Sequence, residues 1–116
     1  MDVYSLKSCD TCRKAVKWLA AQEIAATVFD IRTDGISKAT ISAAVGALGW
    51  EKVLNRRSTS WRNLDEAQKQ DITAEKAISL IADNPTLMKR PLFVCGQSYV
   101  VGFDKVAQEK LAELMP

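Results

Sequence analysis

Two cysteines placed three positions apart, Cys9 and Cys12, are the residues of this chain best suited to covalent chemistry. They form a C-x-x-C motif, in which two thiols can close a disulfide ring. An apolar strand pattern precedes the motif and a helical pattern follows it, so the motif lies where a helix begins. The first amides of a helix lack partners within the helix and carry a partial positive charge, which stabilises a thiolate. Because the thiolate is the attacking species in disulfide exchange, the motif predicts redox chemistry.

The two thiols are expected to have different roles. Cys12 falls on the apolar face of the predicted helix, whereas Cys9 precedes the helix in a polar turn. The apolar face continues at Ala15, Val16 and Leu19. We therefore expect Cys9 to be exposed and nucleophilic, with a pKa below that of a free thiol. Cys12 is expected to point inward and to resolve a mixed disulfide.

Other uses of these thiols were weighed. A C-x-x-C motif is also half of a zinc site, and both thiols could be purely structural. The sequence has no histidine and no second C-x-x-C, so it predicts no metal site. The absence of histidine also removes Cys-His and Ser-His pairs and histidine as a general base. The third cysteine, Cys95, lies in an apolar strand pattern and is expected to be a core thiol.

Arginines supply candidate sites for an anionic group. Arg56 and Arg57, with nearby Arg62, could bind a carboxylate or an oxyanion, or could form a solvated basic face. Arg90-Pro91 opens a predicted strand, and the first position of a strand is one where proline is tolerated. The residues alone favour an ordinary trans bond there, although a cis bond would fix a tight bend.

The remaining pattern predicts the elements that position these residues. Strands are expected over residues 3–6, 26–31, 92–95 and 98–101, the last two joined by a Gly96-Gln97 turn. Helices are expected from Cys12 and after the capping residues Ser37, Thr73 and Asp104, with short pieces around 51–54 and 65–70. The sequence therefore predicts an α/β fold: a thioredoxin-like mixed sheet, β-α-β then β-β-α. It predicts a single domain over residues 1–116, with a helical insertion at roughly 37–84.

Composition and charge narrow the function classes. The 116 residues, 47% of them apolar, fit one compact domain. The net charge of +2 is too small to indicate direct binding to nucleic acid or to a membrane. No apolar run approaches the roughly 20 residues of a membrane span, and no signal-peptide pattern opens the chain. We therefore expect a cytoplasmic protein, in a compartment where thiols stay reduced.

Four segments carry a resemblance to a known family. They are YSLKSCDTCRKAVKWL (4–19), LNRRSTSWRNL (54–64), NPTLMKRPL (84–92) and VGF (101–103). On these segments the chain resembles the arsenate reductase ArsC / Spx / YffB family across nearly its full length, and the second and fourth segments look closest to the YffB-like branch. The resemblance implies a thioredoxin-like fold with a helical insertion. It also implies that Cys9 is the nucleophile, that Arg90-Pro91 is a cis bond facing the cysteine loop, and that Arg90 holds an anion or thiolate.

The YffB-like branch implies a glutathione- or glutaredoxin-coupled thiol–disulfide reductase. Its catalytic residues would be Cys9, Cys12 and Arg90, with no resident cofactor and with glutathione as a co-substrate. Glutathione or glutaredoxin would then be the partner. The residues expected to bind substrate are Arg13, Arg56, Arg57 and Pro91.

The resemblance also implies two alternative functions. An Spx-like regulator would use Cys9 and Cys12 as a redox switch for binding the C-terminal domain of the RNA polymerase α-subunit. An arsenate reductase would hold the oxyanion with three arginines, of which one matches Arg90. The other two positions fall on Asn55 and Gly102 in this chain.

Overall fold

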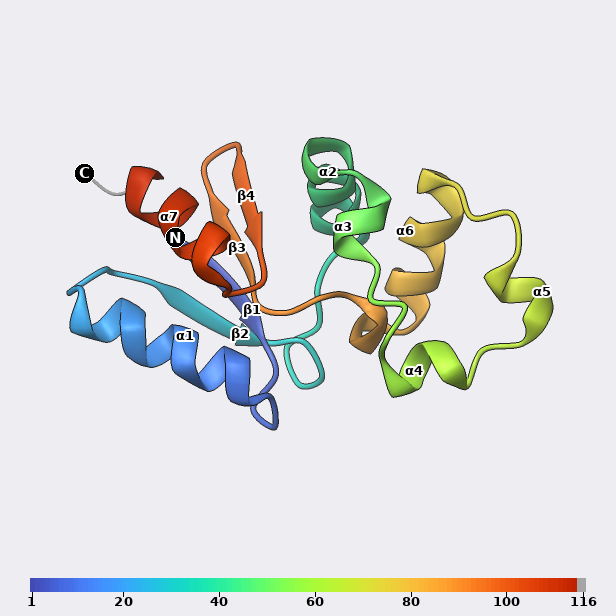
Figure 1. The fold of residues 1–116 in the computed structure, drawn as a ribbon, viewed down its shortest axis with the longest axis horizontal. Helices are drawn as coiled ribbons and strands as arrows, with labels where there is room; N and C mark the ends of the chain where they lie inside the picture. The colour runs from blue at the N-terminus through green and yellow to red at the C-terminus, as the bar shows by residue number, and fades with distance from the viewer. Residues whose placement is uncertain (115–116) are drawn as a thin grey trace. The chain divides into compact units, whose positions relative to one another are not determined.

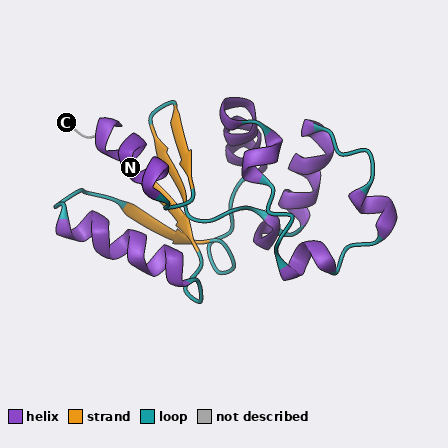
Figure 2. Cartoon of the chain, viewed as in Figure 1, coloured by secondary structure: helices purple, strands orange, loops and turns teal. Residues whose placement is uncertain are grey.

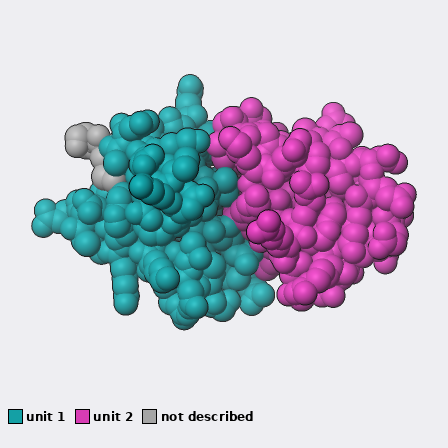
Figure 3. All heavy atoms as spheres, viewed as in Figure 1, with its two compact units in different colours: residues 1–34, 90–116 teal, residues 35–89 magenta. Residues whose placement is uncertain are grey.

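The computed structural model describes residues 1–114. The chain forms two compact units, one made of residues 1–34 and 90–116 and the other of residues 35–89 (Figure 3). The assignment of a single domain over residues 1–116 stays a prediction, and its last two residues lie outside the described part.

The first unit is built on a four-stranded mixed sheet with the strand order β2-β1-β3-β4 (Figures 1 and 2). Its strands are β1 (Asp2–Ser5), β2 (Thr27–Asp30), β3 (Leu92–Cys95) and β4 (Ser98–Val101). β1 and β2 pair in parallel, while β3 pairs antiparallel with both β1 and β4. Helix α1 (Asp10–Ala21) connects β1 to β2, and α7 (Lys105–Leu114) follows β4. This order confirms the predicted α/β, thioredoxin-like sheet.

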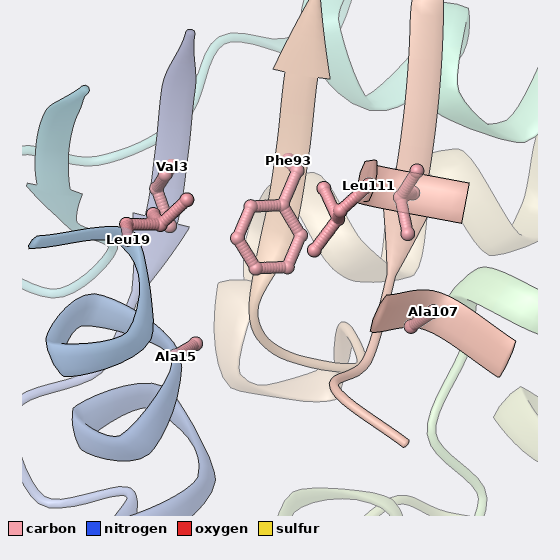
Figure 4. Close-up of a cluster of buried hydrophobic side chains, with 7 residues drawn as sticks. Val3, Ala15, Leu19, Phe93, Ala107 and Leu111 are labelled. Atoms are coloured by element: carbon pink, nitrogen blue, oxygen red, sulfur yellow. The ribbon is translucent and has the colours of Figure 1, made fainter. Parts of the chain in front are cut away.

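Helix α1 is held to the sheet by an apolar core (Figure 4). The buried side chains of this core are Val3, Ala15, Leu19, Phe93, Val100, Ala107 and Leu111. Complete burial of one Leu or Phe side chain contributes about 1.5–3 kcal/mol. Ala15 and Leu19 of α1 belong to this cluster together with residues of β1, β3, β4 and α7. The core therefore fixes the helix whose amino end carries the C-x-x-C motif.

The first turn of α1 begins earlier than predicted. The helix starts at Asp10 instead of Cys12, so Cys9 itself is the N-cap residue. Asp10 and Thr11 are exposed, and for this reason they contribute nothing to the apolar periodicity on which the prediction relied. Because the helix starts earlier, Cys9 lies directly at its amino end, where the first amides have no partner within the helix.

Side-chain caps start three other helices where the sequence predicted them. Ser37, Thr73 and Asp104 each accept a hydrogen bond from a first-turn N–H, at 3.1, 3.2 and 2.8 Å respectively. Such a cap is worth about 1 kcal/mol.

The second unit consists of short helices. They are α2 (Lys38–Leu48), α3 (Trp50–Val53), α4 (Thr59–Arg62), α5 (Glu66–Lys69), α6 (Ala74–Asp83) and the 3-10 helix η1 (Pro85–Leu87). Within this unit α2 packs against α3 and α6. Helix α4 was not predicted, because its single turn shows no apolar period. It forms where the hydroxyl of Ser58 accepts a hydrogen bond from the N–H of Trp61 at 3.1 Å.

Candidate functional site

The thiol of Cys9 lies at the amino end of α1, after the short loop that follows β1. The N–H of Cys9 donates to the carbonyl of Leu6 at 2.9 Å, which closes a tight turn in this loop. The Cys9 carbonyl accepts from the N–H of Arg13 at 3.1 Å, the first hydrogen bond of the helix. The side chain of Cys9 is half-buried, so the sulfur sits beside the helix amides and keeps access to solvent.

Cys12 has a different environment, although it lies one helical turn away. Its side chain is 1% exposed and belongs to the inward face of α1, together with Ala15 and Leu19. The sequence pattern predicted this orientation. The two thiols of the motif are therefore unequal in access: one meets solvent and the other meets the protein interior.

Opposing effects set the pKa of Cys9. Burial of the sulfur disfavours the charged form and raises the pKa, but the backbone amide and the thiol of Cys12, followed by Arg90, lower it by a larger amount. Arg90 acts through both its positive charge and a hydrogen bond. The Cys9 side chain makes no capping hydrogen bond to the first turn, so the Cys12 amide acts on the sulfur as a polar neighbour. The net result is a Cys9 pKa below that of an ordinary thiol.

The pKa of Cys12 shifts in the opposite direction. Burial raises the pKa of the Cys12 thiol to about 12, against partial compensation from the amide of Leu6. A hydrogen bond to Cys9 and the negative charge of the Cys9 thiolate raise it further. The pair therefore titrates in sequence, with Cys9 ionising first. The arrangement therefore favours ionisation of Cys9 while Cys12 keeps its proton.

The backbone before β3 positions Arg90. The Arg90–Pro91 peptide bond is cis, as the resemblance implies. Pro91 is buried, and its carbonyl accepts a hydrogen bond from the N–H of Gly102 at 2.9 Å. The following residue, Leu92, begins β3 and lies opposite Tyr4 of β1. Strand pairing and this turn therefore bring a guanidinium from a distant part of the chain to the Cys9 sulfur.

A buried carboxylate, which our sequence reasoning missed, anchors the loop before Cys9. Asp30 ends β2 and is 7% exposed. Its carboxylate accepts hydrogen bonds from the backbone N–H groups of Lys7 at 3.0 Å, Arg32 at 2.8 Å and Thr33 at 3.2 Å. The Lys7 and Arg32 amides are the strongest influences and lower the Asp30 pKa. The available sequence signal was an aspartate at the end of an otherwise apolar strand.

The other predicted arginines have other surroundings. Arg13 is exposed and forms an ion pair with Asp10 on α1. Arg56 lies over the ring of Trp50, with 5.6 Å between its guanidinium carbon and the ring centroid. Arg57 is exposed. The structure thus brings Cys9, Cys12 and Arg90 together in the first unit, whereas the pair at 56–57 belongs to the second unit.

The described residues show neither a metal cluster nor a membrane-spanning helix. Among residues 1–114, no three His, Cys, Asp or Glu side chains gather closely enough to hold a metal ion. None of the helices in this described part combines the length and the apolar character required to cross a bilayer.

Comparisons with known proteins agree on one family. The model of the ArsC family matches residues 4–111. An uncharacterized protein of Haemophilus influenzae is 42% identical over 103 residues, which cover 89% of this chain and 90% of that protein. The global transcriptional regulator Spx of Streptococcus pyogenes is 29% identical over 100 residues, covering 84% of this chain and 74% of Spx. The solved structure of a YffB protein matches with a TM-score of 0.90 and 37% identity over 98% of both chains. This chain therefore belongs to the ArsC family and has its thioredoxin-like fold.

Proposed function

We propose that this protein is a glutathione- or glutaredoxin-coupled thiol–disulfide reductase in which Cys9 is the nucleophile. The inequality of the two thiols supports the proposal most directly. Cys9 is half-buried at a helix start with a lowered pKa, while Cys12 is buried with a pKa of about 12. The similarity to a YffB structure favours the same branch of the family. Such a reaction belongs in the cytoplasm, whose glutathione pool keeps thiols reduced.

The first chemical step is attack of the Cys9 thiolate on one sulfur of a substrate disulfide. A bond forms between Cys9 and that sulfur, and the other half of the substrate leaves as a thiolate that takes a proton from water. Arg90 stabilises the Cys9 thiolate before the attack. After the attack, Arg90 would hold a carboxylate of the substrate, for which guanidinium geometry is well suited.

The second step releases the bound half of the substrate. Formation of the mixed disulfide removes the Cys9 negative charge, which is one of the causes that raise the Cys12 pKa. Cys12 can then lose its proton and attack Cys9, which forms the Cys9–Cys12 disulfide and frees the substrate thiol. Two glutathione molecules reduce that disulfide and become one glutathione disulfide. Glutathione can instead attack the mixed disulfide directly. This competing route is favoured because Cys12 stays buried, which keeps its pKa raised and slows its own attack.

Turnover of hydroxyethyl disulfide with glutathione, with and without glutaredoxin, tests this proposal. Consumption of glutathione is followed through glutathione reductase and NADPH oxidation. We expect Cys9→Ser to abolish turnover and Cys12→Ser to reduce it. Cys95→Ser is the matched control and retains activity, because Cys95 lies on β3 outside the site. Full turnover by the Cys9→Ser variant would contradict the proposal.

A second candidate function is an Spx-like regulator. It is favoured by the Spx relative, which is 29% identical over 84% of this chain, and by the presence of both thiols. In this case the redox state of Cys9 and Cys12 controls binding to the RNA polymerase α-subunit. A pull-down with the C-terminal domain of that subunit, using oxidised and reduced protein, separates the two functions, because a dedicated reductase binds in neither state. The third candidate function is arsenate reduction. Replacing the disulfide by arsenate in the turnover assay tests it.

A further inference from the structure

A groove opens on the first unit beside the cysteine loop. Its volume is about 400 Å³, and residues of the β1–α1 loop, α1 and β2 line it. Leu6, Val16 and Val28 give the lining its apolar character. Val28 is 44% exposed, a large exposure for an apolar side chain on a strand. The groove therefore presents apolar surface to solvent, and Cys12, the partner of the proposed nucleophile, is among its lining residues.

The charge around this groove has one sign. Lys7, Arg13 and Lys17 are among its lining residues, and no acidic residue is. Arg13 is paired with Asp10, and the charge of Lys7 also acts on the Asp30 carboxylate, so these groups together with Lys17 leave a net positive charge along the lining. Cationic groups around an apolar lining complement a ligand that is both anionic and apolar.

The edge of the sheet argues against an added strand as the occupant. β2 is an edge strand of the sheet. The N–H of Asp30 donates to a carboxylate oxygen of Asp34 at 2.8 Å, and its carbonyl accepts from the N–H of Asp34 at 2.8 Å. These contacts use the main-chain groups that Asp30 would otherwise offer to a neighbouring strand. An added strand therefore cannot pair along the whole of β2, which favours an occupant bound through side chains in the groove.

We infer that the groove is a specificity subsite for a protein substrate, and that it takes an acidic segment with an apolar side chain next to the reactive disulfide. This inference rests on the proposed reductase function. The apolar side chain would pack on Val16 and Val28, while carboxylates pair with Lys7 and Lys17. Lys7 lies only two positions before Cys9, so a segment anchored there holds its disulfide near the nucleophile.

Stoichiometric disulfide exchange with matched peptides tests the subsite. Each peptide carries one cysteine as an S-thiopyridyl disulfide next to a leucine, flanked by glutamates in one peptide and by lysines in the other. The Cys9 thiolate forms a disulfide with the peptide sulfur, and pyridinethione leaves and is followed by its absorbance. A small neutral thiopyridyl disulfide measures the intrinsic reactivity of Cys9 and corrects for any change in its pKa.

Two variants isolate the groove from the general charge of α1. The double variant Lys7→Glu/Lys17→Glu reverses both lysines of the lining. Lys14→Glu is the matched control, because Lys14 is exposed on the same helix but does not line the groove. After correction with the neutral reagent, we expect the double variant to lose about tenfold in rate with the acidic peptide, since two partly exposed ion pairs become repulsive. The control should change by less than about twofold.

The outcomes separate this inference from the proposed function. Faster reaction of the wild type with the acidic peptide, lost only in the double variant, supports the subsite. Equal rates with both peptides, or an equal effect of Lys14→Glu, would overturn the subsite while leaving the reductase intact. Competition by decanoate without any preference for the acidic peptide would identify a free apolar anion as the occupant and overturn the peptide assignment. Failure of Cys9 to react with any of the disulfides would instead overturn the reductase proposal.

Discussion

In the candidate site, the protonation state of each thiol is set by the groups that surround its sulfur atom. Burial works against a thiolate at both Cys9 and Cys12, but only Cys9 has enough compensation from its neighbours. A difference of one pKa unit corresponds to about 1.4 kcal/mol between the two protonation states. The thiol that ionises first is therefore Cys9, the more accessible of the two residues.

Arg90 is expected to account for part of the lowered Cys9 pKa. Arg90→Gln removes both its charge and its charged hydrogen bond, so the pKa of Cys9 should rise. The rate of Cys9 alkylation by iodoacetamide, measured against pH with mass mapping, reports this pKa. Arg90→Lys keeps the charge and should recover part of the shift. An unchanged midpoint in Arg90→Gln would show that the first turn of α1 alone sets the pKa.

Cys12 should make folding sensitive to alkali. Its pKa is raised from 9.0 to about 12 in the folded protein, so the native state holds the proton more tightly than the unfolded chain. The stabilising contribution is complete below pH 9.0 and is lost as the pH rises from there toward about 12. The slope approaches 1.4 kcal/mol per pH unit at most, on the order set by one proton. Urea unfolding at pH values between about 8 and about 11 measures this slope.

A matched variant assigns that slope. Cys12→Ala lacks the titrating group, so its stability should fall less steeply with pH than that of the wild type, whatever its absolute value. Cys95→Ala controls for removal of a thiol elsewhere in the same unit. Parallel slopes in the wild type and Cys12→Ala would refute the raised pKa.

At the scale of elements, the site is a junction of chain segments with different tasks. Helix α1 supplies the amides, the turn before β3 supplies Arg90, and the end of β2 holds the loop before Cys9. The loop depends on Asp30 because the backbone of Lys7 uses that carboxylate as its acceptor. A change at the end of β2 should therefore affect the reactivity of Cys9 without any direct contact.

Asp30→Asn is expected to loosen this loop. An amide group can replace the carboxylate only in part. Its NH₂ takes the place of one carboxylate oxygen, and NH₂ cannot accept a hydrogen bond from a backbone N–H. Cys9 should then alkylate more slowly at neutral pH, as its sulfur is held less well beside Arg90. Asp34→Asn is the matched control, since it changes the same loop region but leaves the Lys7 contact in place. Unchanged alkylation in Asp30→Asn would contradict the anchoring role.

Asp30 should also make folding sensitive to acid. Its pKa is lower in the folded state, so its contribution to stability is present above the unfolded pKa of about 4 and is lost as the pH falls through the folded value. Thermal unfolding between about pH 5 and pH 2 should show this loss. The Asp30→Asn variant should show a shallower acid limb.

Elements bounded by local signals were predictable from the sequence. β3 and β4 have the predicted bounds, because Pro91, the Gly96-Gln97 turn and apolar runs delimit them. The start of α1 and the whole of α4 were missed because their residues are polar and exposed, so burial leaves no periodic trace in the sequence.

The candidate site was predictable to a smaller extent. The spacing of Cys9 and Cys12 identified the motif and the inward thiol, because both depend on a single helix. The approach of Arg90 to Cys9 depends on pairing of β1 with β3, and only the family resemblance indicated it. The role of Asp30 depends on a hydrogen bond to the backbone of Lys7, for which the side-chain pattern holds no information.

At the scale of the whole molecule, thiol ionisation and the basic segment belong to different compact units. The groups that set the pKa of Cys9 lie within residues 1–34 and 90–116, whereas Arg56 and Arg57 lie within residues 35–89. Arginines were predicted to serve two functions, which are to stabilise a thiolate and to bind an anionic substrate. Mutations can therefore separate these functions.

The double variant Arg56→Ala/Arg57→Ala tests that separation. The pH midpoint of Cys9 alkylation should stay within about 0.2 units of the wild type, because Arg90 and the first turn of α1 are unaltered. If these arginines bind substrate, KM for an anionic disulfide should rise by about three- to tenfold, the size expected for exposed charge pairs, while KM for hydroxyethyl disulfide stays constant. Lys52→Ala controls for loss of an exposed positive charge in the same unit. A shifted Cys9 midpoint would show that the two units share one electrostatic site, and an unchanged KM for both substrates would leave Arg56 and Arg57 as a solvated basic face.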